Sequence, residues 1–234
     1  MESSISDARS VALVIGGGPV RGPDREFDAV IAADSGLDVA LAAGFHPTHL
    51  VGDFDSISAD GLRWAEANGV PVERHPTDKD ATDTALALVK ATELGAHHLV
   101  LFGGVGIDRF DHLIGTMVAL GDPALSNLQS ITAHLGASTV SVVHPRRSVT
   151  LDLPRGHVFS LVSMHGACRG VEVLDVRWPL RDATLDIGTT RGVSNESLGR
   201  HIHISCTAGV LTIIVPRPSA DLTATVAAAS TERS

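Results

Sequence analysis

Cysteine is scarce in this 234-residue chain, which contains only Cys168 and Cys206. Two unclustered cysteines argue against a disulfide framework and against a thiolate metal site, so we expect two reduced, buried thiols. No apolar run approaches the roughly 20 residues that a membrane-spanning helix needs. The first ten residues are polar and acidic, where a secretory signal would be basic, so we expect a cytoplasmic protein that binds no membrane.

Aromatic residues and positive charge are also in short supply. Aromatics make up 3% of the chain and tyrosine is absent, which leaves few side chains for stacking on bases. Against 27 Asp and Glu residues stand 18 Lys and Arg residues, giving a formal net charge of −9 without any dense basic run. Because nucleic acid phosphates are bound by clustered cations, we expect no nucleic acid partner.

Apolar residues, by contrast, are plentiful. Hydrophobic residues make up 44% and charged residues 19% of the chain, and its mean hydropathy is +0.19. This composition is typical of a folded globular protein and lacks the signature of disorder. The length allows one large domain or two modest ones.

The first half of the chain alternates short apolar runs with segments of helical period. Strands are predicted at 11–15, 29–33, 49–51 and 98–102, and helices at 36–43, 58–68 and 82–94. Glycines follow several of these elements, as expected where a strand or helix ends. The β-α rhythm predicts a Rossmann-like α/β domain over residues 1–130, with a mostly parallel sheet and flanking helices.

The second half changes to closely spaced, β-branched strands separated by turns rich in Gly, Pro and Asp. They are predicted at 138–143, 148–153, 158–164, 170–176, 201–205 and 210–215. This pattern predicts a C-terminal antiparallel β-sandwich over residues 131–218. Residues 219–234 are polar and Ala-rich, and we expect a disordered tail.

Carboxylates gather where the predicted strands end. Asp34 follows the second strand, Asp53 and Asp55 follow the third, and Asp80 and Asp83 lie near the start of a helix. Ligands of an open parallel sheet bind beyond the carboxyl ends of its strands. Carboxylates that converge there repel one another unless a cation binds them, and oxygen ligands favour Mg²⁺ or Mn²⁺. The sequence therefore predicts a magnesium site that handles phosphate.

Simpler explanations exist for each residue taken alone. Asp is a common helix cap, and Asp78 or Asp80 would serve equally well as the cap of a helix beginning near Ala81. The glycine run 16–18 suits a phosphate cradle, but it suits a plain turn at least as well. The joint occurrence of these features at successive strand ends favours a site.

Four short motifs carry a family resemblance. The runs Ala-Ala-Asp-Ser-Gly at 32–36, Gly-Asp-Phe-Asp-Ser at 52–56, Asp-Lys-Asp-Ala-Thr-Asp at 78–83 and Arg-Phe-Asp-His at 109–112 have the order and spacing of the thiamine pyrophosphokinase family. In the second half, Trp-Pro-Leu at 178–180 and Gly-Val-Ser-Asn-Glu at 192–196 resemble that family's thiamine-binding domain. The resemblance covers nearly the whole chain, from about residue 11 to 215.

The resemblance implies transfer of the terminal diphosphate of ATP to thiamine, with Mg²⁺ and with AMP as the other product. Such a transfer needs charge neutralisation and an aligned hydroxyl more than covalent catalysis. By motif position, Asp53, Asp55 and Asp83 would hold the metal. Asp34 and Asp111 would face the reacting centre or the thiamine, and one of the two would accept the hydroxyl proton.

Substrate contacts are implied in the same way. The ATP side would include Lys79, Asp80, Thr82, Arg109 and His112. Among these, Lys79 and Arg109 would contact phosphate oxygens, and His112 would orient Asp111.

The thiamine side would include Trp178, Ser194 and Asn195. Trp178 offers a flat face to thiamine but would serve equally in a core, and a hydroxyl and an amide suit an aminopyrimidine edge but also a turn. We expect a homodimer with sites shared between subunits, because the family implies it and the small second domain needs cover for its apolar strands.

Two positions depart from the family pattern. Thr116 stands where the family usually has Asn, and Ala85 where it often has Glu, and neither change removes a proposed metal ligand. Three alternatives stay open: a diphosphotransferase acting on another heterocyclic, pterin-like alcohol, a metal-dependent phosphohydrolase, and a silent nucleotide sensor.

Overall fold

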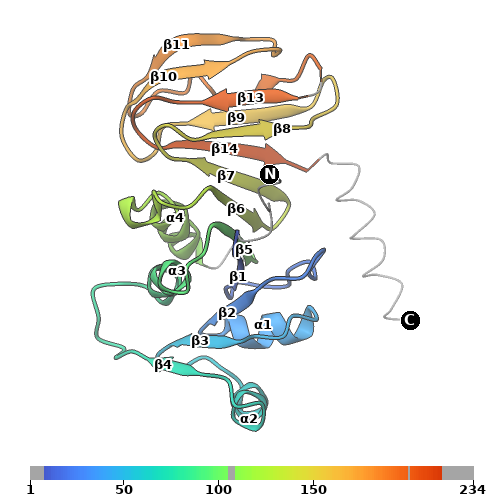
Figure 1. The fold of residues 1–234 in the computed structure, drawn as a ribbon, viewed down its shortest axis with the longest axis vertical. Coiled ribbons are helices and arrows are strands. Elements are labelled where there is room, and N and C mark those ends of the chain that lie inside the picture. Colours follow the sequence, from blue (N-terminus) through green and yellow to red (C-terminus); the bar gives the residue numbers. More distant parts are fainter. Residues whose placement is uncertain (1–7, 105–108, 200, 218–234) are drawn as a thin grey trace, which may run out of the picture. The chain divides into compact units, whose positions relative to one another are not determined.

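The computed structural model describes residues 8–104, 109–199 and 201–217. The chain divides into two compact units, residues 1–136 and 137–234, which are described separately (Figure 1). The domain boundary expected after residue 130 falls at the start of the last strand of unit 1. The tail expected over residues 219–234 lies outside the described residues. No described helix is long and apolar enough to cross a bilayer.

Unit 1 is built on a parallel sheet. In the described part of this unit the strands follow the order β6-β5-β1-β2-β3-β4, and each neighbouring pair runs parallel. Their bounds are β1 Ser10–Val14, β2 Ala29–Ala33, β3 His49–Gly52, β4 Val72–Arg74, β5 His98–Gly103 and β6 Ser130–Leu135. The central strands are continuous apolar runs because helices cover both of their faces.

Helices flank this sheet in the described part of unit 1 (Figure 1). They are α1 Gly36–Ala42, α2 Ala59–Ala67, α3 Asp83–Glu93 and α4 Phe110–Ala119, and a 3₁₀ turn, η2, covers Pro123–Leu125. Residues of α1 and α2 pack in two clusters around Phe102 and Leu50, whereas α3 packs against β1, β2 and β3 and contacts α4. The expected α/β layering is confirmed, and α4 is a helix that the sequence analysis did not predict.

The strand order reverses direction at β1. From β1 the chain moves outward through β2, β3 and β4, then returns to β5 on the other side of β1. The crevice at such a switch point is the usual ligand site of an open α/β sheet. Two glycine segments meet there, because a Cβ on Gly104 would lie 2.3 Å from the carbonyl carbon and oxygen of Gly17.

Unit 2 is a sandwich of two antiparallel sheets. One has the order β12-β9-β14-β7, with bounds Asn195–Glu196, Val158–Val162, Leu211–Pro216 and Ser138–Val143. The other has the order β11-β10-β13-β8, with bounds Leu180–Leu185, Cys168–Val173, Ile202–Ser205 and Ser148–Leu151. The structure confirms the antiparallel class, and it adds β11 and β12 to the predicted strands.

One core joins the two sheets of unit 2. Phe159, Leu161 and Ile213 from the first sheet cluster with inward residues of the second. Cys168 and Cys206 belong to the same core and are both buried free thiols, as expected from the sequence. Burial raises the pKa of the Cys168 thiol to about 11, which keeps it protonated and unreactive at neutral pH.

Candidate active site

A cleft of about 430 Å³ lies at the switch point of unit 1. Its walls come from the ends of β1, β2, β3 and β5, from the segment before α3, and from the first turns of α4. This volume falls within the range of small-molecule sites. The glycines after β1 and β5 line it as well, and their close backbone contact leaves no room for side chains between them.

Asp34 enters the cleft from a sharp turn between β2 and α1. Its backbone lies in the left-handed region, with φ 47°, and its N–H donates to the carbonyl of Val51 at 2.9 Å. The Ser56 hydroxyl donates to Oδ2 of Asp34. The other carboxylate oxygen, Oδ1, is buried and has no hydrogen-bond partner in the described residues. An open, buried carboxylate oxygen is costly unless a ligand satisfies it.

Asp53 follows β3 and is held by the turn that it begins. The backbone N–H of Asp55 donates to Oδ1 at 3.2 Å, and Lys79 Nζ lies 3.2 Å from Oδ2. These contacts, the Asp55 N–H foremost, lower the pKa of Asp53 and keep its carboxylate charged. The next residue, Phe54, has φ 68°, which turns the chain so that Asp53 faces inward.

Arg74 supports this turn from β4. Its guanidinium donates to the carbonyl of Asp53 at 2.9 Å and lies 4.6 Å from the ring centre of Phe54. Arg74 was not among the candidate residues predicted from the sequence. Its partners, Asp53 and Phe54, lie about twenty residues earlier in the chain, so the sequence around Arg74 carries no local signal of this role.

Asp83 comes from the first turn of α3. The hydroxyl of Thr82 caps this helix by accepting from the N–H of Ala85 at 3.2 Å. The cap is therefore Thr82, and neither Asp78 nor Asp80 fills that role. A carboxylate in the first turn is favourable because it faces the positive end of the helix dipole.

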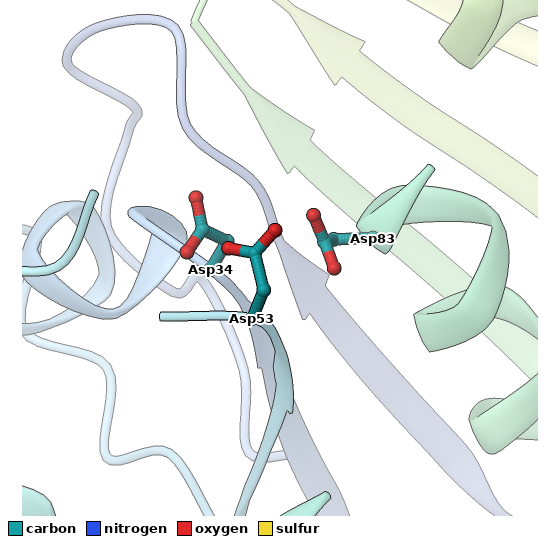
Figure 2. A group of neighbouring side chains, drawn as sticks. All are labelled: Asp34, Asp53 and Asp83. Carbon is teal, nitrogen blue, oxygen red and sulfur yellow. The ribbon is translucent and has the colours of Figure 1, made fainter. Parts of the chain in front are cut away.

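The three carboxylates converge. One oxygen each of Asp34, Asp53 and Asp83 lies within 4.8 Å of the others, and the side chains face a common space (Figure 2). No other such group of potential ligands occurs in the described ranges. The set differs from the predicted one, because Asp34 belongs to it and Asp55 does not. Asp55 is exposed outside the cleft lining, and the neighbouring negative charge of Asp53 raises its pKa.

Lys79 is the cation of this cluster. Its ammonium lies 3.2 Å from Asp53 and 3.1 Å from Asp83, with 14% of its side chain exposed. Burial opposes its charge, but the hydrogen bonds to the two carboxylates outweigh burial and raise the pKa of Lys79. One lysine offsets only part of three carboxylates, so the rim keeps room for a further positive charge.

The Arg109 segment reaches the cleft at the start of α4. Arg109 and His112 line the cleft, whereas Asp111 is exposed and does not. Arg109 makes a bidentate pair with Asp111, with Nε 3.1 Å from Oδ1 and Nη2 3.0 Å from Oδ2. This pair lowers the pKa of Asp111 to about 2. Arg109 also contacts Nε2 of His112.

Of the two remaining residues predicted for the ATP side, one lines the cleft and the other does not. Thr82 lines the cleft beside Asp83, whereas Asp80 is exposed and does not. Thr77, which the sequence analysis passed over, lines the cleft and helps to lower the pKa of Asp53. Thr116 is buried in the lining.

The predicted thiamine-side residues lie together in unit 2. Trp178 is 52% exposed, so the core-packing alternative is wrong. Ser194 is exposed with φ 60°, and its N–H donates to the Ser160 hydroxyl at 3.1 Å. Asn195 is buried and bonds to the backbone of Trp178. The pairing between residues seventeen positions apart was not visible in the sequence.

Two family models match the chain. Residues 25–131 match the model of the thiamin pyrophosphokinase catalytic domain, and residues 143–211 match that of the thiamin pyrophosphokinase vitamin B1 binding domain. Together these matches cover well over half of the chain.

Individual proteins agree with this match. The thiamine pyrophosphokinase of Bacillus subtilis is 26% identical over 208 residues, which are 86% of this chain and 96% of that protein. A crystal structure of a thiamine pyrophosphokinase from Bacillus subtilis matches 90% of this chain and 100% of its own, with a TM-score of 0.73 at 23% identity. The thiamin pyrophosphokinase of Geobacillus thermodenitrificans matches 90% of this chain and 98% of its own, with a TM-score of 0.69 at 26% identity.

Proposed function

Because the chain belongs to the thiamin pyrophosphokinase family, we propose that it transfers the diphosphate of ATP to thiamine. The hydroxyethyl oxygen of thiamine attacks the β-phosphorus, and the bond from that phosphorus to the α-β bridging oxygen breaks. AMP leaves with that oxygen, thiamine diphosphate forms, and the hydroxyl proton passes to a base. The observation that supports this proposal most is the convergence of Asp34, Asp53 and Asp83 at the switch-point cleft.

The donor set of this cluster fits Mg²⁺. All three candidate ligands are carboxylates, and Asp34 Oδ1 is buried with no partner in the described part of the chain. Asp34, Asp53 and Asp83 would hold the ion. When bound, Mg²⁺ would neutralise triphosphate charge and so let an anionic substrate approach an acidic rim. Asp55, expected as a ligand from the motif, does not belong to this group and is left out of the proposed set.

Cationic and backbone groups complete the phosphate side. Lys79 and Arg109 line the cleft and would contact phosphate oxygens, Arg109 through guanidinium N–H groups other than the Nε–H and Nη2–H that face Asp111. Thr82 and the backbone at Gly17 would add neutral donors. Asp80 is exposed outside the lining, so we place it away from the nucleotide.

The proton acceptor is one of two carboxylates. The bidentate contact with Arg109 holds the pKa of Asp111 at about 2, which makes Asp111 a poor base while that pair persists. Asp34 lines the cleft and Asp111 does not. We therefore assign the position next to the incoming hydroxyl to Asp34, whose carboxylate would hold the ion through one oxygen and face the hydroxyl with the other, and we assign His112 to the support of the Arg109 pair.

Unit 2 would supply the thiamine contacts through Trp178 and Ser194. An exposed indole suits a flat cationic ring, and the Ser194 hydroxyl suits an aminopyrimidine edge. The homodimer with shared sites, the cytoplasmic location and the lack of nucleic acid or membrane partners stay predictions from the sequence.

The test is a product assay. Purified protein is incubated with ATP, Mg²⁺ and one acceptor at a time: thiamine, a pterin-like alcohol, or none. We expect AMP and thiamine diphosphate in equal amounts, and only with thiamine. AMP formed with the pterin alcohol alone would make the protein a different diphosphotransferase, and phosphate released without an acceptor would make it a hydrolase. No turnover under any condition would overturn the proposed transfer.

A further inference from the structure

The side-chain amide of Asn195 makes three hydrogen bonds inside unit 2. The residue is 4% exposed. Its Oδ1 accepts from the N–H of Trp178 at 3.2 Å and from the N–H of Glu196 at 2.8 Å, and its Nδ2 donates to the carbonyl of Trp178 at 2.8 Å. An amide offers two donors and one acceptor oxygen, so little capacity is left for a ligand.

Trp178, whose backbone Asn195 contacts, is unusually exposed to solvent. Trp178 is 52% exposed, although large aromatic side chains are mostly buried. Both of its backbone polar groups bond to the one buried amide of Asn195. The backbone of an exposed indole is thus fixed from beneath.

A second pair of residues holds the ring itself. The Arg177 guanidinium lies 4.8 Å from the ring centre of Trp178. Arg177 is in turn tied to Glu196, with Nη1 3.0 Å from Oε2 and the backbone N–H 2.8 Å from the Glu196 carbonyl. Residues 176–178 are therefore bound to residues 195–197 by side-chain, backbone and ring contacts, including a bridge between Val176 and Ser197.

We propose that Asn195 is a positioning residue that acts on thiamine through Trp178 and makes no side-chain contact with the substrate. This inference rests on the proposed function, and it replaces the direct contact that the motif suggested. A ring whose backbone and face are fixed before binding loses little freedom when a flat heterocycle stacks on it. Releasing the ring should weaken the binding of thiamine and leave the binding of ATP alone.

Fluorescence tests the structural half of the proposal. The chain has two tryptophans, so the Trp64→Phe variant leaves Trp178 as the single emitter. In that background, Asn195→Ala should raise acrylamide quenching of Trp178 and lower its anisotropy. Asn195→Asp, which keeps the acceptor but loses the donor, should give a smaller change of the same sign. Unchanged quenching and anisotropy in the folded Asn195→Ala protein would overturn the proposal.

Ser163→Ala is the matched control. Ser163 is 3% exposed and donates to the carbonyl of Asp186 at 2.9 Å in the same unit, so its loss also removes one buried side-chain hydrogen bond. It should lower thermal stability without altering Trp178 fluorescence. An equal fluorescence change in both variants would mean general loosening of unit 2 and would count against a specific role of Asn195.

Kinetics tests the functional half. Asn195→Ala and Trp178→Ala should each raise the thiamine KM about tenfold and leave the ATP KM within about twofold. The double variant should match Trp178→Ala, because Asn195 acts through that ring. Effects of the two changes that multiply would show that Asn195 contacts thiamine itself, and an effect on the ATP KM would place it elsewhere.

The two proposals fail separately. If the wild-type protein does not convert thiamine to thiamine diphosphate, the proposed function fails, whereas Trp178 fluorescence still decides whether Asn195 fixes the ring. If Asn195→Ala does not fold, Asn195→Asp, which keeps the acceptor oxygen and loses the donor to the Trp178 carbonyl, provides the test. Unchanged Trp178 quenching and anisotropy in the folded Asn195→Asp protein would then overturn the proposal.

Discussion

Asp34 in unit 1 and Asn195 in unit 2 are both polar side chains at motif positions, but their hydrogen bonding is opposite. Asp34 keeps one buried oxygen without a partner in the described residues, on a backbone in the left-handed region. Asn195 has its amide engaged by two neighbouring residues. The first arrangement costs stability and leaves an oxygen ready for a ligand, whereas the second adds stability and leaves little capacity for a ligand.

This contrast distinguishes residues that bind a ligand from residues that position a neighbouring side chain, although both kinds occur in the family motifs. A polar residue that is unsatisfied at a cleft indicates a ligand contact. A polar residue that is satisfied below an exposed ring indicates that the ring makes the contact. Lys79 combines both features. It pairs with Asp53 and Asp83, and it lies where the phosphates of the proposed substrate would bind.

The largest effect is expected from removing charge at the open cluster. Asp53→Asn should lower kcat about a thousandfold, because the amide keeps the shape but removes a charge that would hold the proposed Mg²⁺. The circular dichroism spectrum should not change. Asp60→Asn is the control, since Asp60 is an exposed residue of α2 that pairs with Arg63. Turnover of Asp53→Asn within tenfold of wild type would remove Asp53 from the metal site.

Lys79→Met should move two measurements in opposite directions. The kcat/KM for ATP should fall about a hundredfold, because a phosphate contact is lost. Binding of Mn²⁺ to the nucleotide-free protein, followed by calorimetry, should tighten, because the carboxylates lose their competing cation.

Lys90→Met provides the matched control for that experiment. Lys90 also pairs with two carboxylates, Glu73 at 2.9 Å and Glu93 at 3.2 Å, but lies outside the cleft lining. It should change neither measurement. Weaker Mn²⁺ binding in Lys79→Met would show that Lys79 organises the site and does not compete for it.

Gly104→Ala tests the backbone contact at the switch point. The added Cβ would lie 2.3 Å from the Gly17 carbonyl, so one glycine segment must shift. We expect a loss of about 1–3 kcal/mol in the free energy of unfolding and an ATP KM raised about tenfold.

Gly115→Ala in α4 is the opposite case. Apart from Gly115 itself, its chain neighbours and the backbone of its own helix, no heavy atom lies within 4 Å of the Cβ position, so the change should stabilise the helix by about 0.5–1 kcal/mol. Denaturant unfolding of both variants measures the difference. Equal stability of the two would mean that the Gly17 contact is not a constraint.

The smallest effect is expected at Asp111, which is satisfied but exposed. Its pKa is about 2 in the folded protein against 3.8 ordinarily, so its contribution to stability is present above pH 3.8 and is lost as the pH falls toward 2. The Tm difference between wild type and Asp111→Asn should be small and constant above about pH 5, and should shrink on further acidification. A difference that grows with acid would contradict this ion pair.

Much of the fold could be predicted from the sequence because the central strands are buried on both faces. The predicted strand over residues 29–33 and the structural β2 coincide, and Ser58 and Thr82 cap the helices whose starts were predicted there. Helix α4 was missed because Ile114 and Val118 are exposed, which blurs its apolar face. Strand β12 has two residues and is too short to give a periodic signal.

The sequence predicts that a carboxylate cluster forms the candidate site, but it does not predict which Asp residues belong to the cluster. Carboxylates at successive strand ends had to lie near one edge of a parallel sheet. The choice between Asp34 and Asp55 depends on the left-handed turns at Asp34 and Phe54, which residue spacing does not specify. The role of Asn195 depends on a partner seventeen positions away, so only the folded chain could reveal it.

The two buried thiols provide a chemical probe for the opening of unit 2. Cys168 and Cys206 both lie in the core of unit 2, and the chain has no cysteine elsewhere. A thiol reagent can therefore modify the native protein only when that core opens. The labelling rate reports the opening of unit 2 by itself, while unit 1 contributes no signal to the count of modified thiols.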